Sequence, residues 1–340
     1  MRPDIMHVAT PGFFVLPAII YSRILKLPLV ISYHTHLSVY ADRYVTVPGL
    51  KQLAVALTNM ILPAVLNCAD LTLATSPQLQ SELEAIGCER VDVWRKGVDT
   101  EVFSPKYNVS NSEMRSMLSG GEPHRPLLLY VGRLGAEKNI GMIKEVLMRL
   151  PEARLAVVGG GPAEEDLKRH FDGHDVVFTG TMYGESLSRA YAAADVFVMP
   201  SESETLGFVV LEAMASGLPT VCADAGGLPN LVLDNESGFL FEAGNAEDLT
   251  SKVRRLVHDS KLRRSMGDSG REEALRWNWQ AATSVLRNVQ YTLAERRFRE
   301  RQRWIDRRMR WEDWVGFFRM KGLGSSVVGG AYNGTQPSDT

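Results

Sequence analysis

Short apolar runs recur along the whole chain, and longer segments with helical spacing separate them. Leu127–Val131 and Leu155–Val158 are typical, because both contain only aliphatic and aromatic residues. Continuous runs of this length are typical of strands that are buried on both faces of a parallel sheet. Their alternation with helical segments predicts an α/β fold in which helices flank parallel sheets.

The predicted strands fall into two groups. A polar segment, residues 106–125, separates them, and 340 residues are enough for two domains that each bury a core. We therefore predict a first domain over residues 1–112 and a second over residues 113–285. The strands are Ile5–Val8, Leu29–Tyr33, Leu71–Ala74 and Val91–Val93 in the first, and Leu127–Val131, Leu155–Val158, Val176–Phe178, Val196–Val198 and Thr220–Cys222 in the second.

Charge and cysteine content exclude some classes of function. The net charge of −2 argues against a general binder of polyanions, so we expect no nucleic-acid partner. Cys68, Cys88 and Cys222 are far apart and form neither a CxxC pair nor a His/Cys ligand spacing. We interpret them as reduced, mostly buried thiols, and we predict no metal site.

The most informative motif contains two glutamates, Glu204 and Glu212, eight residues apart. It follows the apolar run at residues 195–200 and enters a helix that ends at residues 217–219. Glu204 is therefore expected in a loop and Glu212 about two turns into the helix. The N–H groups and positive dipole end of that helix suit a diphosphate, while the carboxylates suit sugar hydroxyls. The motif predicts a nucleotide-sugar site.

Two cations, Arg133 and Lys138, follow the strand at Leu127–Val131. Ligands of doubly wound sheets bind at the carboxyl ends of the strands, where two cations can neutralise a departing diphosphate. The alternative is an exposed turn around Glu137 and Lys138. A glycine-rich turn at residues 159–162 is weak evidence on its own.

These motifs together resemble the retaining GT-B glycosyltransferases of the family 4 type, which use nucleotide-sugar donors. Within that family the sequence is most similar to the plant and algal sulfoquinovosyltransferases, which transfer sulfoquinovose to diacylglycerol. The resemblance covers most of the chain. It implies two Rossmann-like domains facing across a cleft, with C-terminal helices that cross back to the first domain. The segments that carry it are residues 130–139, 157–162, 200–219 and 223–229, with residues 32–36, 94–99 and 277–291 in support.

The resemblance also implies roles for single residues. The donor diphosphate would contact Gly132, Arg133, Lys138 and the backbone N–H groups of Leu206, Gly207 and Phe208. Glu204 would accept hydrogen bonds from the transferred sugar, Glu212 from the ribose, and Thr181 and Met182 would contact the nucleobase. His34 would approach the donor sugar, although a lone histidine is more often a core residue. His36 is a weaker candidate than His34, and Arg43 is a candidate for a sulfonate group. The expected catalytic residues are His34, Arg133, Lys138 and Glu204.

The implied chemistry needs no resident cofactor. A UDP-sugar is the expected donor, and no motif requires Mg²⁺, although free Mg²⁺ could assist turnover. No carboxylate nucleophile is evident near His34, so front-face attack is expected instead of double displacement. The expected partners are a lipid acceptor, diacylglycerol, and the surface of the plastid envelope membrane. In the family, part of the first domain would precede Met1, so we expect a fragment. Transfer of another hexose and a non-catalytic nucleotide-binding chain remain alternatives.

Two further segments bear on membrane contact. Leu53–Ala69 carries no charge, but it is short for a membrane span and is interrupted by Asn59, Pro63 and Asn67, so a buried or membrane-contacting helix is expected. Residues 286–321 are expected to form basic, aromatic helices, because residues 291–321 hold ten Arg or Lys against five acidic residues. Their face either packs on the first domain or meets an anionic bilayer. Residues 322–340 are expected to be disordered.

Overall fold

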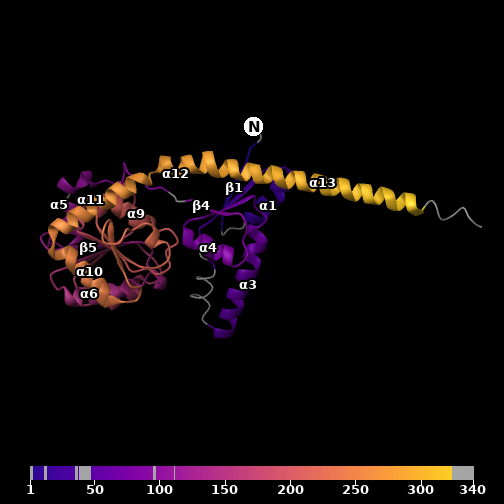
Figure 1. Ribbon diagram of the computed structural model, residues 1–340. Coiled ribbons are helices and arrows are strands. Elements are labelled where there is room, and N and C mark those ends of the chain that lie inside the picture. Colours follow the sequence, from indigo (N-terminus) through magenta and orange to yellow (C-terminus); the bar gives the residue numbers. More distant parts are fainter. Residues whose placement is uncertain are drawn as a thin grey trace, which may run out of the picture.

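Two parallel sheets organise the chain in the computed structural model, which describes residues 3–10, 14–34, 37, 47–94, 97–110 and 112–323 (Figure 1). The sheet of the first lobe has the order β1-β2-β3-β4. All of its strand pairs are parallel, as continuous apolar strands require. Its strands are β1 (Met6–Thr10), β2 (Leu29–Tyr33), β3 (Leu71–Ala74) and β4 (Val91–Val93), and its helices are α1 (Val15–Ile24), α3 (Pro48–Leu66) and α4 (Pro77–Ala85).

The sheet of the second lobe has six strands in the order β10-β9-β8-β5-β6-β7. These are β5 (Leu127–Val131), β6 (Arg154–Val158), β7 (Val176–Gly180), β8 (Val196–Met199), β9 (Thr220–Ala223) and β10 (Gly238–Phe241). The predicted α/β class and the predicted strands are confirmed, with shifts of one or two residues at the ends. Sequence reasoning missed β10, a short edge strand that directly follows a turn in which Asp234 accepts a hydrogen bond from the Leu240 N–H.

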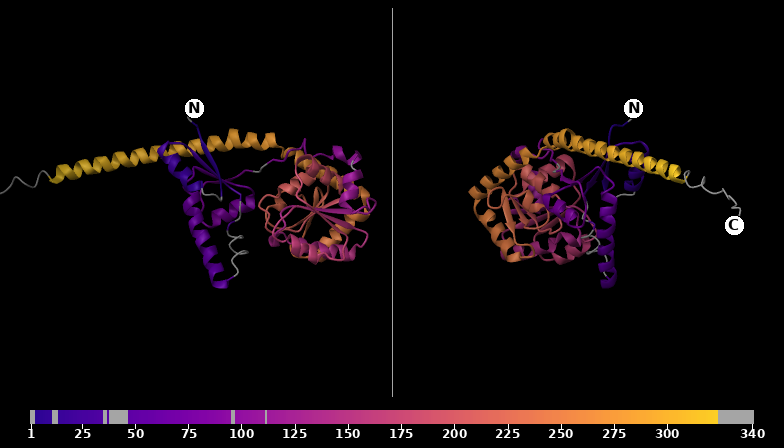
Figure 2. Two further views of the ribbon diagram at one scale, coloured as in Figure 1. Left: turned by 180° about the vertical axis from the view of Figure 1, so that it is seen from behind. Right: turned by 45° about the vertical axis from the view of Figure 1, so that its right-hand side comes forward.

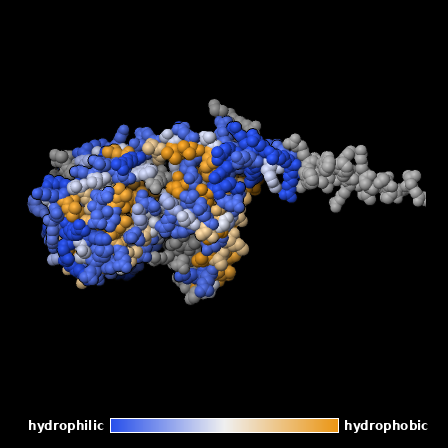
Figure 3. All heavy atoms as spheres, in the orientation of Figure 1, coloured by the Kyte–Doolittle hydropathy of each residue, from blue (hydrophilic) through white to orange (hydrophobic). Residues whose placement is uncertain are grey.

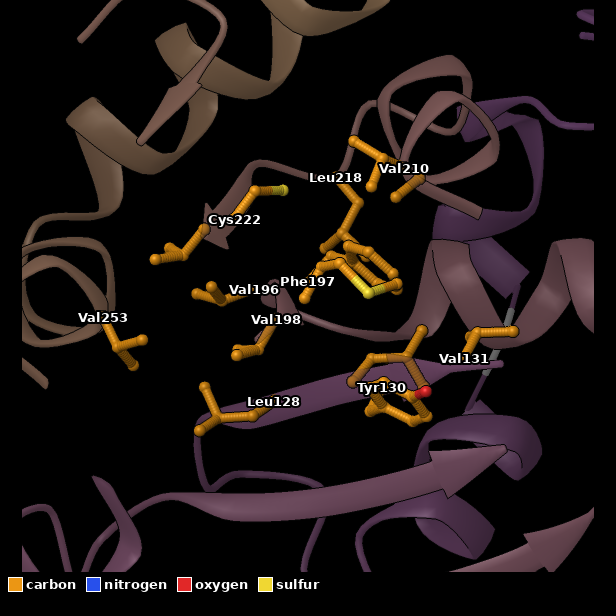
Figure 4. Close-up of a cluster of buried hydrophobic side chains, with 14 of the residues drawn as sticks. Leu128, Tyr130, Val131, Val196, Phe197, Val198, Val210, Leu218, Cys222 and Val253 are labelled. Carbon is orange, nitrogen blue, oxygen red and sulfur yellow. The ribbon is translucent and has the colours of Figure 1, made fainter. Parts of the chain in front are cut away.

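Helices cover both faces of this second sheet, whose buried side chains form a continuous core (Figure 4). Leu128 and Phe197, from neighbouring strands, are completely buried, and Val210 of α9 packs on them from one side. Val253 of α10 packs from another. The helices are α5 (Ser112–Leu118), α6 (Ile143–Arg149), α7 (Glu164–His170), α8 (Gly184–Ala193), α9 (Phe208–Ala215), α10 (Ala246–His258) and α11 (Ser260–Arg276).

The chain passes between the lobes at two adjacent points. Val98 donates its N–H to Trp277 O at 3.0 Å, and a Cβ on Gly97 would lie 2.4 Å from Asn278 O, so only glycine fits there. The 3-10 helix η1 (Pro105–Ser110) already packs against α8 of the second lobe. The domain limits at residues 1–112 and 113–285 remain a prediction from the sequence.

The last helices return to the first lobe, as predicted. They are α12 (Trp279–Val285), the π-helical turn η5 (Leu286–Gln290) and α13 (Tyr291–Leu323), which runs along the first lobe and beyond it (Figures 1 and 2). The Trp94 indole donates to Ala282 O at 3.1 Å, Gln290 donates to Asp92 at 3.0 Å, and Tyr291 bonds His7 at 2.9 Å. Trp304 is exposed. The aromatic side chains predicted at positions 311–318 lie outside the described side chains.

Helix α3 is long and apolar enough, by length and composition, to cross a membrane, yet only 11% of its Gly49–Leu66 stretch is buried. It continues through Pro63 without a break. Its last turn packs into the first lobe through Leu62 and Leu66, while the rest projects from the lobe (Figure 2). The sequence predicted either a buried or a membrane-contacting helix here, and the buried alternative is therefore wrong for most of α3.

Candidate active site

A cleft of about 310 Å³ lies between the two lobes, at the carboxyl ends of β2, β3, β5 and β8. Most of the residues predicted for the site meet here. From the first lobe come His34 and Thr75, and the second lobe contributes Tyr130, Val131, Gly132, Arg133, Lys138, Met199, Glu204, Thr205, Leu206, Gly207, Phe208 and Val209.

The strand order explains why these segments converge. β5 and β8 are neighbours, although β6 and β7 lie between them in sequence. The chain therefore leaves β5 toward one edge of the sheet and leaves β8 toward the other, which opens a crevice between the two loops. Arg133 and Lys138 follow β5, and Glu204 follows β8, so both loops face the same crevice.

Lys138 and Glu204 form the central ion pair of the cleft. The Lys138 Nζ lies 2.5 Å from the Glu204 Oε1, and each side chain is 16% exposed. Arg133 is more exposed and pairs with Glu137, a carboxylate that is itself buried. The alternative of an exposed Glu137–Lys138 turn is therefore wrong. Two cations and one acceptor carboxylate face the same small volume.

The start of α9 forms the floor between these groups. Gly207 precedes the helix with φ +77°, a conformation that favours glycine, and Leu206, Gly207 and Phe208 line the cleft. The first N–H groups of a helix carry the positive end of its dipole, which suits an anion. Behind the loop, Gly227 donates its N–H to Glu204 O at 2.7 Å. A Cβ on Gly226 would lie 2.4 Å from the same oxygen, so a larger residue would displace Glu204.

Glu212 does not line the cleft. Because α9 begins only at Phe208, Glu212 lies little more than one turn into the helix, and the predicted two turns are wrong. Its Oε2 accepts a hydrogen bond from the hydroxyl of the fully buried Tyr191 at 2.8 Å. Burial raises the pKa of Glu212 to about 7, and the Tyr191 hydrogen bond lowers it only in part. Glu212 is therefore a half-buried acid with a raised pKa rather than a surface residue.

We expect Glu212→Gln to stabilise the fold at alkaline pH. The folded chain holds the Glu212 proton up to about pH 7, whereas an unfolded glutamate releases it near pH 4.3. The contribution of this group to the free energy of unfolding therefore falls as pH rises between these values. Glutamine keeps an acceptor for Tyr191 without the charge. Thermal unfolding should show a higher midpoint for the variant at pH 8, and the gain should vanish by about pH 5. If the difference in thermal midpoint between the variant and the wild type is the same at pH 5 and pH 8, a buried charge on Glu212 is not its cause.

Thr181 and Met182 lie beside the cleft rather than in its lining. They follow β7, two strands from β5, where Thr181 is exposed and Met182 packs on the core. Gly159 connects the two regions, because its N–H donates to Gly180 O at 2.8 Å and a Cβ on it would lie 1.9 Å from Gly132 O. The glycine-rich turn therefore allows close packing of the loops after β5, β6 and β7.

His34 lines the cleft from the first lobe, next to Thr75. Sequence reasoning did not identify Thr75, Thr205, Glu137 and Tyr191 as site residues. Thr205 and Glu137 lie within the predicted motifs, whereas Thr75 and Tyr191 join the site only through tertiary packing. The candidates His36 and Arg43 lie outside the described residues. Within the described ranges, no group of three or more His, Cys, Asp or Glu side chains could hold a metal ion.

Comparisons with known proteins identify the family to which the chain is related. The family model described as "Glycosyl transferases group 1" matches residues 119–273, and "Glycosyltransferase Family 4" matches residues 1–102. The sulfoquinovosyl transferase SQD2 of Arabidopsis thaliana is 46% identical over 299 residues, which cover 86% of this chain and 57% of that protein. The chain thus spans little more than half of that relative. A GDP-mannose-dependent alpha-mannosyltransferase of Mycolicibacterium smegmatis is 33% identical over 285 residues, covering 84% of this chain and 72% of that protein.

Solved structures show the same architecture. Sucrose-phosphate synthase from Thermosynechococcus elongatus superposes with a TM-score of 0.71 at 25% identity, over 85% of this chain and 73% of that one. The Anabaena protein Alr3699/HepE, solved in complex with UDP and glucose, gives 0.69 at 23% identity, over 86% and 77%. The latter likeness concerns the fold alone. The arrangement of two parallel-sheet lobes is therefore the GT-B fold that the sequence predicted.

Proposed function

The chain belongs to the glycosyltransferase group 1 family, and on that premise we propose that it transfers a sugar from a nucleotide-sugar donor to a lipid. The donor we propose is UDP-sulfoquinovose and the acceptor diacylglycerol, which gives a sulfolipid. The single observation that carries the proposal is the interlobe cleft in which Arg133, Lys138, Glu204 and the start of α9 converge.

The donor diphosphate would lie against the start of α9. Arg133 and Lys138 supply positive charge there, and the N–H groups of Leu206, Gly207 and Phe208 supply hydrogen-bond donors. These groups stabilise the negative charge that grows on the diphosphate as it leaves. Positioning and charge stabilisation then account for the rate enhancement, with no resident cofactor.

Glu204 would hold the transferred sugar. Its Oε1 is paired with Lys138, which fixes the carboxylate and leaves acceptor capacity for sugar hydroxyls. We propose that Glu212 accepts from the ribose, with Tyr191 orienting the carboxylate from behind. Thr181 and Met182 would contact the nucleobase at the end of β7.

Front-face attack fits the groups that line the cleft. Among its described lining residues, Glu204 alone carries a carboxylate, and Lys138 holds it. Double displacement needs a carboxylate free to attack the anomeric carbon. We propose that the acceptor hydroxyl instead enters beside the leaving phosphate, whose oxygen takes its proton. His34 would face the sugar from the first lobe, and the configuration would be retained.

The choice of sulfoquinovose rests on the resemblance in the sequence and on the Arabidopsis relative. A second candidate is transfer of mannose, because relatives at 33–35% identity are named GDP-mannose-dependent mannosyltransferases. The test is to supply UDP-sulfoquinovose, UDP-glucose and GDP-mannose in turn with diacylglycerol vesicles and to measure lipid products by mass spectrometry. A sulfonated glycolipid supports the proposal, and a product without sulfur rejects it. Nucleotide binding without turnover of any donor would favour a non-catalytic chain.

A lipid acceptor requires contact with a membrane, and we propose that α1 and α3 of the first lobe supply it, at the plastid envelope. Both helices expose large apolar side chains, and apolar patches lie on the surface of this lobe (Figure 3). Neither helix holds an acidic residue, whereas Arg23, Lys26 and Lys51 accompany them. This combination suits peripheral attachment to an anionic bilayer. The exposed side chains are Leu16, Ile20, Tyr21 and Ile24 in α1, and Leu50, Leu53, Leu57, Met60 and Ile61 in α3.

We expect the double variant Leu57→Glu/Met60→Glu to reduce binding to phosphatidylglycerol vesicles at least about tenfold, because each buried Leu or Met contributes about 1.5 kcal/mol or more. Co-sedimentation with vesicles measures the bound fraction. Leu233→Glu, at an exposed leucine of the second lobe, is the matched control and should bind normally. Equal binding of all three proteins would reject this surface.

A further inference from the structure

Two hydrogen bonds join the first lobe directly to the loop that carries Glu204. The Thr75 hydroxyl donates to Thr205 O at 3.1 Å, and the Thr205 hydroxyl donates to His34 O at 3.2 Å. His34 follows β2 and Thr75 follows β3, so both lie at the carboxyl edge of the first sheet. We call Thr75, Thr205 and the His34 carbonyl the interlobe clasp.

The clasp lies inside the cleft. All three of its residues line the cleft, and Thr205 is the neighbour of Glu204 in the chain. Thr75 is 4% exposed, so little water reaches its hydroxyl. The second lobe supports the same loop from behind through the Gly227 N–H. The first lobe therefore contacts a loop that the second lobe already fixes.

The clasp is separate from the points where the chain crosses between lobes. The crossings run side by side at Gly97–Val98 and Trp277–Asn278, joined by the Val98 N–H to Trp277 O bond. Rotation about this pair of segments would move the lobes apart while leaving each core intact. Both clasp bonds span the lobes, so they exist only when the lobes are closed.

We propose that Thr75 and Thr205 are positioning residues that lock the closed lobes, so that His34 faces the sugar held by Glu204. The effect of these two residues on turnover rests on the proposed function. Thr205 is suited to the role because one residue both accepts from the first lobe through its carbonyl and donates to it through its hydroxyl. In the proposed function, by contrast, all residues that contact the nucleotide belong to the second lobe. The clasp should therefore govern turnover and not the affinity for UDP.

The test compares Thr75→Val and Thr205→Val with Thr75→Ser and Thr205→Ser, which keep the hydroxyl. A neutral hydrogen bond changes an equilibrium by several-fold, so we expect each valine variant to lower kcat about tenfold. The dissociation constant of UDP should stay within about twofold, and the serine variants should recover most of the turnover. Thr250→Val is the matched control, because Thr250 is equally buried and its hydroxyl bonds Ala246 O in its own helix.

A second readout is independent of turnover. Spin labels at the exposed Glu84 of α4 and Glu165 of α7 report the distance between lobes with and without UDP. The wild-type chain should show a major closed population, which the valine variants should lose. Valine variants with wild-type distances, or with turnover within twofold of wild type, would overturn the clasp. If the wild-type chain turns over no donor, the proposed function fails, and the distance measurement alone still decides the clasp.

Discussion

We expect Lys138→Ala to lower sugar transfer by about a hundredfold or more, while the chain stays folded. Removal of one group that stabilises developing negative charge typically costs a factor of 10² to 10³ in kcat. Lys138 is suited to that task, because it lies at the switch point of the sheet and is 16% exposed, so water screens it little. Initial rates at saturating donor measure the loss, and circular dichroism checks that the fold persists.

Glu204→Gln should lower the rate of sugar transfer by a similar factor. The cause would be a weaker contact with the sugar hydroxyls and not with the diphosphate. Because Lys138 and Glu204 are 2.5 Å apart and act on one substrate, the double variant should cost little more than the worse single variant. Lys168→Ala is the control, since that lysine is an exposed partner of Glu164 and Glu165 on α7. Near wild-type activity in both single variants would reject the site.

The parts of this site that sequence could predict are those that depend on strand ends. Continuous apolar runs identify β5 and β8, and residues that follow such strands must face the carboxyl edge of the sheet. That rule predicts the edge of the sheet at which Arg133, Lys138 and Glu204 lie. β10 escaped prediction because a four-residue run beginning with Gly238 gives too little periodic signal.

Other parts of the site depend on tertiary packing, which no local pattern encodes. The pairing of Glu212 with Tyr191 depends on how α8 packs on α9, and sequence spacing does not predict that contact. The clasp joins residues 130 positions apart, from different sheets. Sequence reasoning could identify Glu212 as an acid that needs a partner. It could not tell that a tyrosine hydroxyl already supplies one.

The return of α13 was predicted, but the contact that holds it was not, and this contact is a buried ion pair. The Asp70 carboxylate is only 2% exposed and accepts from Arg301 Nε at 2.8 Å and Nη2 at 2.9 Å. It also accepts from the Leu29 N–H at 2.9 Å, at the start of β2. Asp70 therefore ties the helix to the sheet of the first lobe.

Arg301→Met should lower the free energy of unfolding of the first lobe by about 3 kcal/mol at pH 8, because it removes the cation that is hydrogen-bonded to a buried carboxylate and leaves only the charges of Arg23 and Arg90 near it. Methionine keeps most of the apolar stem of the arginine side chain. The loss of unfolding free energy therefore measures mainly the effect of removing the charge. Urea unfolding gives the energy, and limited trypsin digestion should release α13 faster. The control is Arg299→Met, an exposed arginine paired only with Glu295 among the described ion pairs, which should cost less than about 1 kcal/mol.

The dependence on pH identifies the cause of this loss. Burial raises the pKa of Asp70 to about 6, although the Leu29 hydrogen bond and the charges of Arg23 and Arg90 oppose it. Without Arg301, Asp70 would take up a proton at still higher pH, which removes the buried charge. The deficit of Arg301→Met should thus be largest at pH 8 and shrink as pH falls through 6 toward 5, and Asp70→Asn/Arg301→Met should recover stability at pH 8. A deficit that is equal at pH 5 and pH 8 would mean that Arg301 contributes through packing of its stem, and the ion pair would not be what holds α13 against the first lobe.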